Sequence, residues 1–417
     1  MEGLVSRRAV SIVRSVMQDE PVVAIQGPRA VGKTTLLRQV ADELGAEVLD
    51  LDDLATRQAV ASDPALFVGA DPPVCIDEYQ HVPELLDAIK AELNVDGSAG
   101  RFLLTGSTRH DALPQAAQAL TGRLHLVTLL PLSQGELAGH PERFASALLD
   151  DPAGLVTPRT SPTTRQQYVE RVCAGGFPLA VGRADTARNR WFDDYVTLTL
   201  ERDVRELSRT RQREKMPALL ARLAAQTAQV VSVSKAGADA GLTQNTADEY
   251  TRLLEAVFLI HRLPAWGTTL SARSGSSPKL HVVDSGLAAR LLRLSAARLA
   301  ERDATSLQQF GHLLETFVVG ELRKQLSWLD GVALIGHWRT HDGVEVDLVV
   351  ETDDGRVAAV EVKASSRMRG ADLRGLELLR DKLGQRFVGG VALYTGGRSY
   401  TAADRVHVLP VDRLWAR

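Results

Sequence analysis

The feature that most restricts the fold is a glycine-bounded loop near the start of the chain, Gly27-Pro28-Arg29-Ala30-Val31-Gly32-Lys33-Thr34. It follows the apolar run 22–26 and precedes a helical pattern at 34–44. Glycines let such a loop curl so that its N–H groups face a phosphate, and the helix N-terminus adds positive potential. The spacing GxxxxGK[ST] also supplies a lysine for the β- and γ-phosphates and a hydroxyl for Mg²⁺. We therefore predict a phosphate-binding loop (P-loop) in an α/β domain.

The residues expected to contact a nucleotide lie in this loop and at the ends of two later apolar runs. Residues 73–76 lead into Asp77 and Glu78, and residues 101–105 end in Thr105. Asp77 is predicted to hold Mg²⁺ together with Thr34, and Glu78 to polarise the attacking water. The alternative for Glu78 is a solvated carboxylate at a strand end. The predicted nucleotide is ATP, and its predicted contacts are Gly27, Gly32, Lys33, Thr34, Thr35, Asp77, Thr105 and Arg123.

Thr105 and Arg123 are assigned from their positions in the chain. Thr105 is a candidate for sensing the γ-phosphate or holding the attacking water. Arg123, which ends the segment 120–123, is a candidate arginine finger for the nucleotide of a neighbouring subunit. That role requires a homo-oligomer, and the alternative for Arg123 is a surface ion pair.

Several motifs resemble those of a known family. GPRAVGKTTLLRQ, DEYQ at residues 77–80, LLTGS, LTGR and PLSQGE are similar to segments of prokaryotic AAA-type ATPases that carry an uncharacterised C-terminal domain. Further along, residues 175–178 (GGFP) and 195–204 resemble the start of the second half of that family. The resemblance spans nearly the whole chain and implies an AAA-type ATPase domain at the N-terminus.

The composition of the 417 residues excludes several classes of protein. With 44% hydrophobic and 24% charged residues, the chain is globular and long enough for two or three domains. The net charge of −3 shows no overall basic bias, so a surface that binds nucleic acid must be local. Cys75 and Cys173 are too far apart for a CxxC pair, which argues against a structural zinc site or a disulfide framework. No apolar run spans a membrane and residues 1–18 lack a signal-peptide core, so we expect a cytoplasmic protein without a membrane partner.

Patterns along the chain predict three domains. Residues 1–150 alternate strand-like and helical segments, as expected for a parallel sheet covered by helices. Residues 150–164 are rich in Asp, Pro, Gly, Ser and Thr, which marks a boundary. Residues 165–300 are mostly helical, and residues 305–417 follow the order αβββαβ.

A helix-turn-helix pattern lies in the central domain. A short helix begins at residues 233–236, a turn follows at 241–243, and residues 244–256 form a second helix. Residues 258–262 and 279–283 are the predicted strands of a wing, with the loop 268–278 at its tip. Gln244, Asn245 and Arg252 are predicted to contact DNA, the expected nucleic-acid partner. The alternative is an interaction or spacer module without DNA contact.

Two runs of the C-terminal domain, 344–350 and 357–363, alternate in polarity as the strands of a β-hairpin do. A three-residue loop at 353–355 would pair Thr352 with Arg356 and place Asp347 opposite Glu361. A two-residue loop would place Asp347 opposite Val362 instead. The sequence leaves both registers open, and the first groups Asp347 and Glu361 on one face.

The acidic residues of this hairpin predict a metal site, because clustered carboxylates repel one another unless a cation joins them. Mg²⁺ prefers such oxygen ligands, and Mn²⁺ is an alternative. The predicted ligands are Asp347, Glu361 and Glu315, which lies on the preceding helix. Lys363 would orient a metal-activated water or neutralise the transition state. The pattern Asp347, Glu361-x-Lys363 resembles the PD-(D/E)xK nuclease superfamily, although Val346 stands where that motif has proline. The resemblance implies a restriction-endonuclease-like fold in which Asp347, Glu361 and Lys363 are catalytic.

These features together predict an α/β protein: an N-terminal AAA-type parallel-sheet domain, a central helical and winged-helix region, and a C-terminal nuclease-like domain. The predicted function is ATP hydrolysis, with Glu78 as its catalytic residue, coupled to DNA binding and metal-dependent cleavage in DNA processing, repair or defence. The alternative is a regulatory or scaffold AAA-type ATPase whose C-terminal domain binds nucleic acid or protein without cleaving.

Overall fold

The computed structural model describes residues 4–110, 120–207, 212–269 and 277–416. Contacts divide the chain into two compact units. Unit 1 comprises Met1–Leu132, Val196–Arg211 and Arg252–Leu259, and unit 2 comprises Ser133–Tyr195, Gln212–Thr251 and Ile260–Arg417. The three predicted domains, 1–150, 165–300 and 305–417, divide the chain at other positions.

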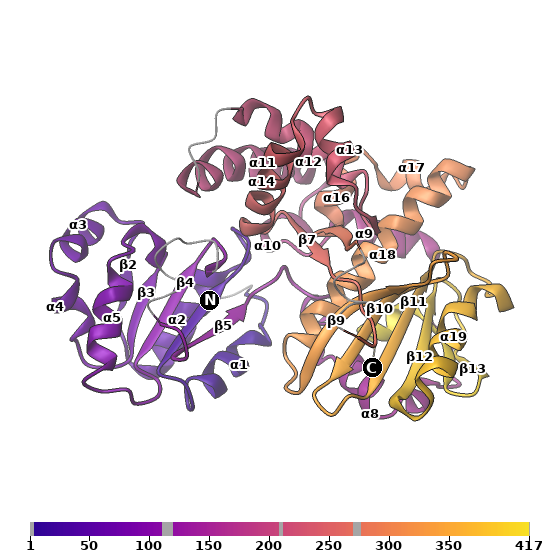
Figure 1. Cartoon of the computed structure of the whole chain (residues 1–417), viewed down its shortest axis with the longest axis horizontal. Helices are drawn as coiled ribbons and strands as arrows, with labels where there is room; N and C mark the ends of the chain where they lie inside the picture. Colours follow the sequence, from indigo (N-terminus) through magenta and orange to yellow (C-terminus); the bar gives the residue numbers. More distant parts are fainter. Residues whose placement is uncertain (1–3, 111–119, 208–211, 270–276, 417) are drawn as a thin grey trace. The chain divides into compact units, whose positions relative to one another are not determined.

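Unit 1 is built on a five-stranded parallel sheet (Figure 1, indigo to purple). Its strands are β1 Val22–Gln26, β2 Val48–Asp50, β3 Val74–Asp77, β4 Phe102–Gly106 and β5 Leu124–Thr128, in the order β2-β3-β4-β1-β5. Strands β1, β3 and β4 are buried along their whole length, as expected when helices cover a parallel sheet. Because β4 lies between β1 and β3, the segments that follow these three strands meet at one edge.

The helices of unit 1 begin and end at residues with clear local signals. Helix α3 starts after Asp53, whose carboxylate accepts the N–H of Thr56, and α2 ends at Gly45 in the left-handed region with φ +69°. The predicted strands at 22–26, 73–76 and 101–105 and the helix at 34–44 are confirmed to within a residue. The bounds are α1 Ala9–Val16, α2 Lys33–Leu44, α3 Leu54–Ser62, α4 Pro64–Val68 and α5 Leu85–Leu93.

The central segment has the element order of a winged helix. It runs α12 Met216–Ala224, β6 Gln229–Val230, α13 Val233–Asp239, α14 Gln244–Ala256, β7 Ile260–Leu263 and β8 Lys279–Val282, and its sheet has the order β6-β8-β7. A Cβ on Gly237 would lie 2.4 Å from the Cβ of Ala247, so glycine is what lets α13 and α14 approach. The two predicted helices and two wing strands are confirmed. Of the predicted wing loop 268–278, residues 270–276 lie outside the described residues.

The remaining helices of the described residues connect the elements given above and below. Helices α11 and α14 contribute residues to both units. No helix within the described ranges combines the length and apolarity needed to cross a membrane. The bounds are α7 Gln134–Ala138, α8 Phe144–Asp150, α9 Arg165–Ala174, α10 Pro178–Val181, α11 Asp185–Leu207, α16 Ser285–Leu291 and α17 Ala296–Ala300.

The C-terminal part of unit 2 is a six-stranded mixed sheet with α18 Ala304–Leu326 and α19 Arg374–Leu383 packed on it (Figure 1, orange to yellow). Its strands are β9 Val332–Arg339, β10 Glu345–Thr352, β11 Val357–Lys363, β12 Phe387–Tyr394, β13 Tyr400–Ala403 and β14 Val406–Pro410, in the order β13-β14-β12-β11-β10-β9. The predicted order αβββαβ is confirmed, and two further strands follow it. The resemblance to a restriction endonuclease stays a prediction.

The β10–β11 hairpin adopts the first of the two predicted registers. Leu348 lies opposite Val360, and the N–H of Thr352 donates to the carbonyl of Arg356 at 2.9 Å. The same register extended by one pair places Asp347 opposite Glu361. The three-residue loop at 353–355 is therefore correct, and the hairpin groups the acidic residues as predicted.

Candidate functional site

The loop after β1 has the backbone shape that phosphate binding needs. Gly27 has φ +153° and Gly32 has φ +97°, both in the region that favours glycine. A Cβ on Gly27 would lie 2.1 Å from the carbonyl oxygen of Leu129, whereas a Cβ on Gly32 would meet no atom within 4 Å. Gly27 therefore packs the loop tightly against its neighbour, and Gly32 leaves an open cradle at the N-terminus of α2.

Lys33 begins α2 and is buried, with only 5% of its surface exposed. Its ammonium donates to the carbonyl oxygens of Gly27 and Pro28 at 3.0 and 2.9 Å. These two contacts hold the positive charge against the loop itself. Of the residues that follow, Thr34 is half-buried and Thr35 is exposed.

Asp77, Thr34 and Thr105 meet at the carboxyl edge of the sheet. Asp77 ends β3, and Thr105 lies near the end of the paired parallel strand β4. The hydroxyl of Thr105 donates to the Asp77 carboxylate, and Thr34 makes a second side-chain hydrogen bond to it. Burial raises the pKa of Asp77, and the hydrogen bonds from the two hydroxyls oppose that rise. Residues predicted from three separate segments thus form one cluster.

Glu78 has an unusual backbone conformation beside this cluster. Its φ of 54° and ψ of 47° lie in the left-handed region, which is unfavourable for a residue with a Cβ and is often retained at functional sites. Its N–H donates to the hydroxyl of Thr105 at 3.2 Å. Its carboxylate accepts a hydrogen bond from Gln80, whose side chain also donates to Ser107 at 3.2 Å. Sequence reasoning assigned no role to Gln80 or Ser107, although both belong to the motifs DEYQ and LLTGS.

Arg123 lies apart from the other predicted contacts. Strand β5 pairs with β1 in parallel, and Leu124 lies opposite Val22 at the amino ends of both strands. Arg123 precedes β5 and is therefore at the edge of the sheet opposite the P-loop, where its guanidinium donates to Asn94 at 2.9 Å. The structure does not bring Arg123 to the nucleotide site of its own chain. A role toward the nucleotide of a neighbouring subunit stays a prediction.

The residues at the carboxyl edge fit a nucleotide with Mg²⁺. The open cradle and the first turn of α2 offer N–H groups to phosphate, and Lys33 offers a positive charge. Thr34 and Asp77 are hydrogen-bonded neighbours, and a hydroxyl with a carboxylate is the kind of oxygen donor pair that Mg²⁺ prefers. When bound, Mg²⁺ neutralises and orients the phosphates. The predicted roles of these residues toward ATP stay predictions.

The predicted metal ligands of the C-terminal sheet surround a lysine that the sequence interpretation did not include. Lys279 lies on β8 and is 1% exposed. Its ammonium is 2.7 Å from Oδ1 of Asp347, 2.8 Å from Oε1 of Glu315 and 3.8 Å from Oε1 of Glu345. Glu361 is paired instead with Lys363, the neighbour two residues along β11. Each predicted ligand therefore already has a lysine partner.

Within this cluster, Lys279 and Asp347 stabilise each other's charged form. Burial opposes the ionisation of Lys279, but Asp347 and Glu315 outweigh it and raise the pKa of Lys279 above its usual range. Burial likewise favours the neutral form of Asp347, yet Lys279 holds the pKa of that carboxyl below its usual value. Burial and the nearby Asp347 raise the pKa of Glu361 to about 8 and that of Glu315 well above its usual value.

The prediction of a metal site at Glu315, Asp347 and Glu361 does not fit this arrangement. Within residues 4–110, 120–207, 212–269 and 277–416, no group of three or more His, Cys, Asp or Glu side chains is placed to hold a metal ion. The physical reason is that an ammonium already occupies the space between Glu315 and Asp347 and donates a hydrogen bond to each of them.

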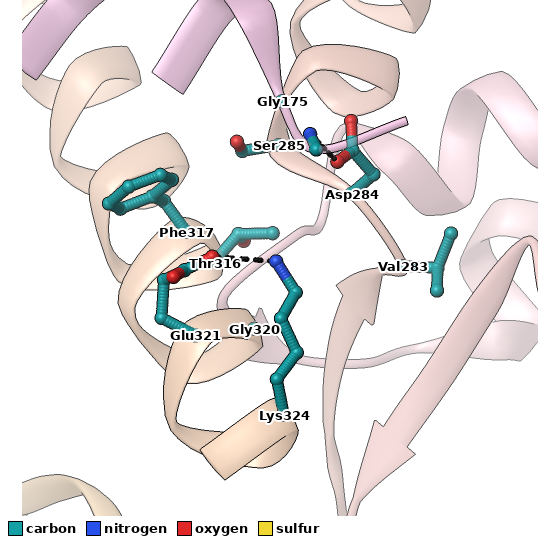
Figure 2. Close-up of a pocket in the computed structure, with 10 residues that line it drawn as sticks. Gly175, Val283, Asp284, Ser285, Thr316, Phe317, Gly320, Glu321 and Lys324 are labelled. Carbon is teal, nitrogen blue, oxygen red and sulfur yellow. Dashed lines mark hydrogen bonds and ion pairs between the residues drawn. The ribbon is translucent and has the colours of Figure 1, made fainter. Parts of the chain in front are cut away.

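A small cavity lies elsewhere in unit 2, between the 175–176 turn and α18. It has a volume of about 10 Å³, room for about one water molecule. Figure 2 shows Asp284 beside Gly175 and Lys324 reaching back along α18 to Glu321, an ion pair of 2.6 Å. Asp284 also accepts the N–H groups of Gly176 and Leu287. These groups hold the turn and the helix in place, and the space is too small for a substrate.

The residues predicted to contact DNA are exposed on α14. Gln244 and Asn245 open the helix, and Arg252 lies further along it. Exposure leaves all three available to a partner, and their contact with DNA stays a prediction.

Comparison with known proteins divides the chain into three matched segments. Residues 19–138 match an AAA domain, and residues 165–298 and 310–414 match two domains of unknown function, DUF8612 and DUF4143. The uncharacterised proteins Rv2008c of Mycobacterium tuberculosis and Mb2031c of Mycobacterium bovis are each 27% identical over 419 aligned positions, covering 99% of this chain and 85% of theirs. Among solved structures, the Walker-type ATPase PABY2304 of Pyrococcus abyssi aligns with a TM-score of 0.42 and 14% identity, over 70% of this chain and 96% of its own.

The AAA match covers all five strands of the parallel sheet, the P-loop and the segment that carries Asp77 and Glu78. Sequence match and site geometry therefore agree on the same residues. Residues 19–138 form an AAA-type P-loop ATPase domain.

Proposed function

We propose that this chain is an ATP hydrolase of the regulatory or scaffold kind, whose second half binds a partner without cleaving it. The observation that carries the hydrolase part is the cluster of Thr34, Asp77 and Thr105 with Glu78 beside it. A P-loop is sufficient for nucleotide binding. Hydrolysis also requires a residue that positions or activates water, and the strained, hydrogen-bonded Glu78 suits that task.

Each residue of the cluster has a proposed task. Lys33 and the N–H groups of the P-loop bind the phosphates, while Thr34 and Asp77 hold Mg²⁺. Glu78 accepts a proton from the attacking water, and Gln80 keeps its carboxylate oriented by a hydrogen bond. Thr105 links Asp77 to the backbone of Glu78, because its hydroxyl donates to the Asp77 carboxylate and accepts the N–H of Glu78.

Replacing Lys33 by alanine tests this proposal. We expect ATP turnover to fall by about 10²-fold or more, because the charge that stabilises the phosphates is lost in a preorganised site. Phosphate release from ATP in Mg²⁺ measures the effect. Lys90→Ala, a change at an exposed lysine of α5, is the matched control and should keep normal turnover. Unchanged turnover in Lys33→Ala would remove the basis of the proposed hydrolysis.

The partner proposed for the second half is nucleic acid, expected to be DNA. Two observations support it: the winged-helix strand order β6-β8-β7, and the close packing of α13 on α14 at Gly237. Gln244 and Asn245 are exposed at the start of the second helix, which is the part that reads bases in helix-turn-helix proteins. The pairing of Asp347 and Glu315 with Lys279 favours binding without cleavage.

One experiment with DNA tests both parts of this proposal. Labelled duplex DNA is incubated with the full chain in Mg²⁺ or Mn²⁺; anisotropy reports binding, and gels of plasmid and linear DNA report cleavage. We expect salt-sensitive binding that weakens several-fold in Gln244→Ala/Asn245→Ala, with no cleavage by the wild type. Absence of binding would overturn the partner assignment. Cleavage that is lost in both Asp347→Ala and Lys363→Ala would instead establish the nuclease predicted from the sequence.

A further inference from the structure

The acidic cluster of the C-terminal sheet is organised around one ammonium. Lys279 comes from β8, Glu315 from α18 and Asp347 from β10, so three separate elements bring the charges together. The nitrogen lies 2.8 Å from Glu315 Oε1 and 2.7 Å from Asp347 Oδ1. Charges buried to this degree persist only when they are paired and hydrogen-bonded.

A divalent cation bound by the same two oxygens would have to occupy the volume of this ammonium. Mg²⁺ takes oxygen ligands at about 2.0–2.1 Å, so its position between Glu315 and Asp347 would coincide with that of the lysine nitrogen. The second oxygen of Asp347 is also engaged, because it accepts the N–H of Val362 at 2.9 Å. The ammonium and a metal are therefore mutually exclusive occupants of the cluster.

The cluster still retains one oxygen that a metal could use. Oε2 of Glu361 is buried and has no hydrogen-bond partner in the part of the chain that the structure describes. With the ammonium gone, the carboxyl groups of Glu315, Asp347 and Glu361 would face one another without the positive charge that now lies between Glu315 and Asp347. Such a set of oxygens has high affinity for a hard divalent cation.

We propose that Lys279 takes the place of a divalent cation in this cluster. The wild-type chain binds neither Mg²⁺ nor Mn²⁺ there, and removal of the ammonium creates a site for one ion. The cluster lies within unit 2, and the exclusion of a metal from it is independent of ATP hydrolysis. Lys279, on the wing strand β8, is the internal counter-ion of Glu315 and Asp347.

Manganese titration of the full chain tests the proposal, with calorimetry and the electron paramagnetic resonance of free Mn²⁺ as readouts. We expect Lys279→Met to bind one more Mn²⁺ than the wild type, and the added change Asp347→Asn to abolish that extra ion. Lys324→Met is the matched control, because Lys324 is also buried and forms an ion pair with a glutamate on α18, Glu321, outside the acidic cluster. It should bind as many ions as the wild type.

Two results would overturn the proposal. The first is a Mn²⁺ ion bound by the wild type and lost in Asp347→Asn, because the ammonium would then not exclude a metal. The second is a folded Lys279→Met chain, with wild-type circular dichroism, that gains no ion. If Lys279→Met does not fold by itself, Mn²⁺ should restore its fold, and failure to do so in both Lys279→Met and Lys279→Gln also counts against the proposal. Lys279→Arg keeps the charge and should gain no ion.

Discussion

Replacing Glu78 by glutamine will lower the rate of ATP hydrolysis by about 10²- to 10⁴-fold, the usual contribution of a positioned general base. Glutamine has nearly the same shape and can still accept the hydrogen bond from Gln80, but it cannot take a proton from water. Binding of ATP should remain, because Lys33, Thr34 and Asp77 are unchanged. Steady-state phosphate release measures turnover, and fluorescence of a labelled ATP analogue measures binding.

Glu84→Gln is the control for this change, since Glu84 is an exposed glutamate six residues further along the same segment. It should leave both turnover and affinity as in the wild type. A chain with Glu78→Gln that hydrolyses ATP at the wild-type rate would show that Glu78 is only a solvated carboxylate at the end of β3. A parallel loss of ATP binding would instead show a structural role.

The second large effect concerns the stability of unit 2. Lys279→Met should lower its free energy of unfolding at neutral pH by about 3–5 kcal/mol, the cost of leaving buried charges without a partner. Methionine fills most of the same volume, so the loss comes from charge rather than from a cavity. Asp347 and Glu315 are the residues left without a counter-ion.

This loss should depend on pH with a definite sign. Without the ammonium, burial raises the folded-state pKa values of Asp347 and Glu315 above their unfolded values, so the folded state binds more protons. The stability of the variant therefore falls as pH rises from about 4 to neutral, and its deficit is smallest in acid. The wild type should show a weaker dependence over this range, because Lys279 keeps Asp347 ionised.

Urea titrations followed by tryptophan fluorescence can report this change selectively. All five tryptophans of the chain lie in unit 2: Trp191, Trp266, Trp328, Trp338 and Trp415. Midpoints at pH 5 and pH 7 for the wild type, Lys279→Met and Lys279→Arg give the comparison. A Lys279→Met midpoint equal to that of the wild type at pH 7 would mean that the buried pair contributes nothing to stability.

Local sequence patterns were sufficient for the N-terminal site. The glycine at 32 supplies a backbone conformation that few other residues adopt, and a strand before it and a helix after it place the loop. Asp77 and Glu78 could be assigned because a buried strand precedes them and parallel strands end at one edge. The position of Arg123 could not be predicted from a local pattern. Arg123 precedes β5, so the edge of the sheet at which it lies depends on the direction of β5 within the sheet.

The hairpin of the C-terminal domain was an intermediate case. Its alternation predicted two strands, while its register depended on a loop of two or three residues that the sequence alone left open. The hydrogen bond from the N–H of Thr352 to the carbonyl of Arg356 shows that the loop has three residues. The grouping of Asp347 with Glu361 follows from that register.

What the sequence by itself determined is therefore the P-loop domain, the order of the elements and the identity of the acidic residues. Only the tertiary structure decided which group forms ion pairs with Glu315 and Asp347. Lys279 lies 36 residues before Glu315 and 68 before Asp347, on a strand of a different sheet. A lysine in a short strand ordinarily indicates an exposed position, and no periodicity connects it to partners so distant in the chain. The packing of β8 beside α18 and β10 buries its ammonium among carboxylates, and electrostatics then makes it, rather than a metal ion, their partner.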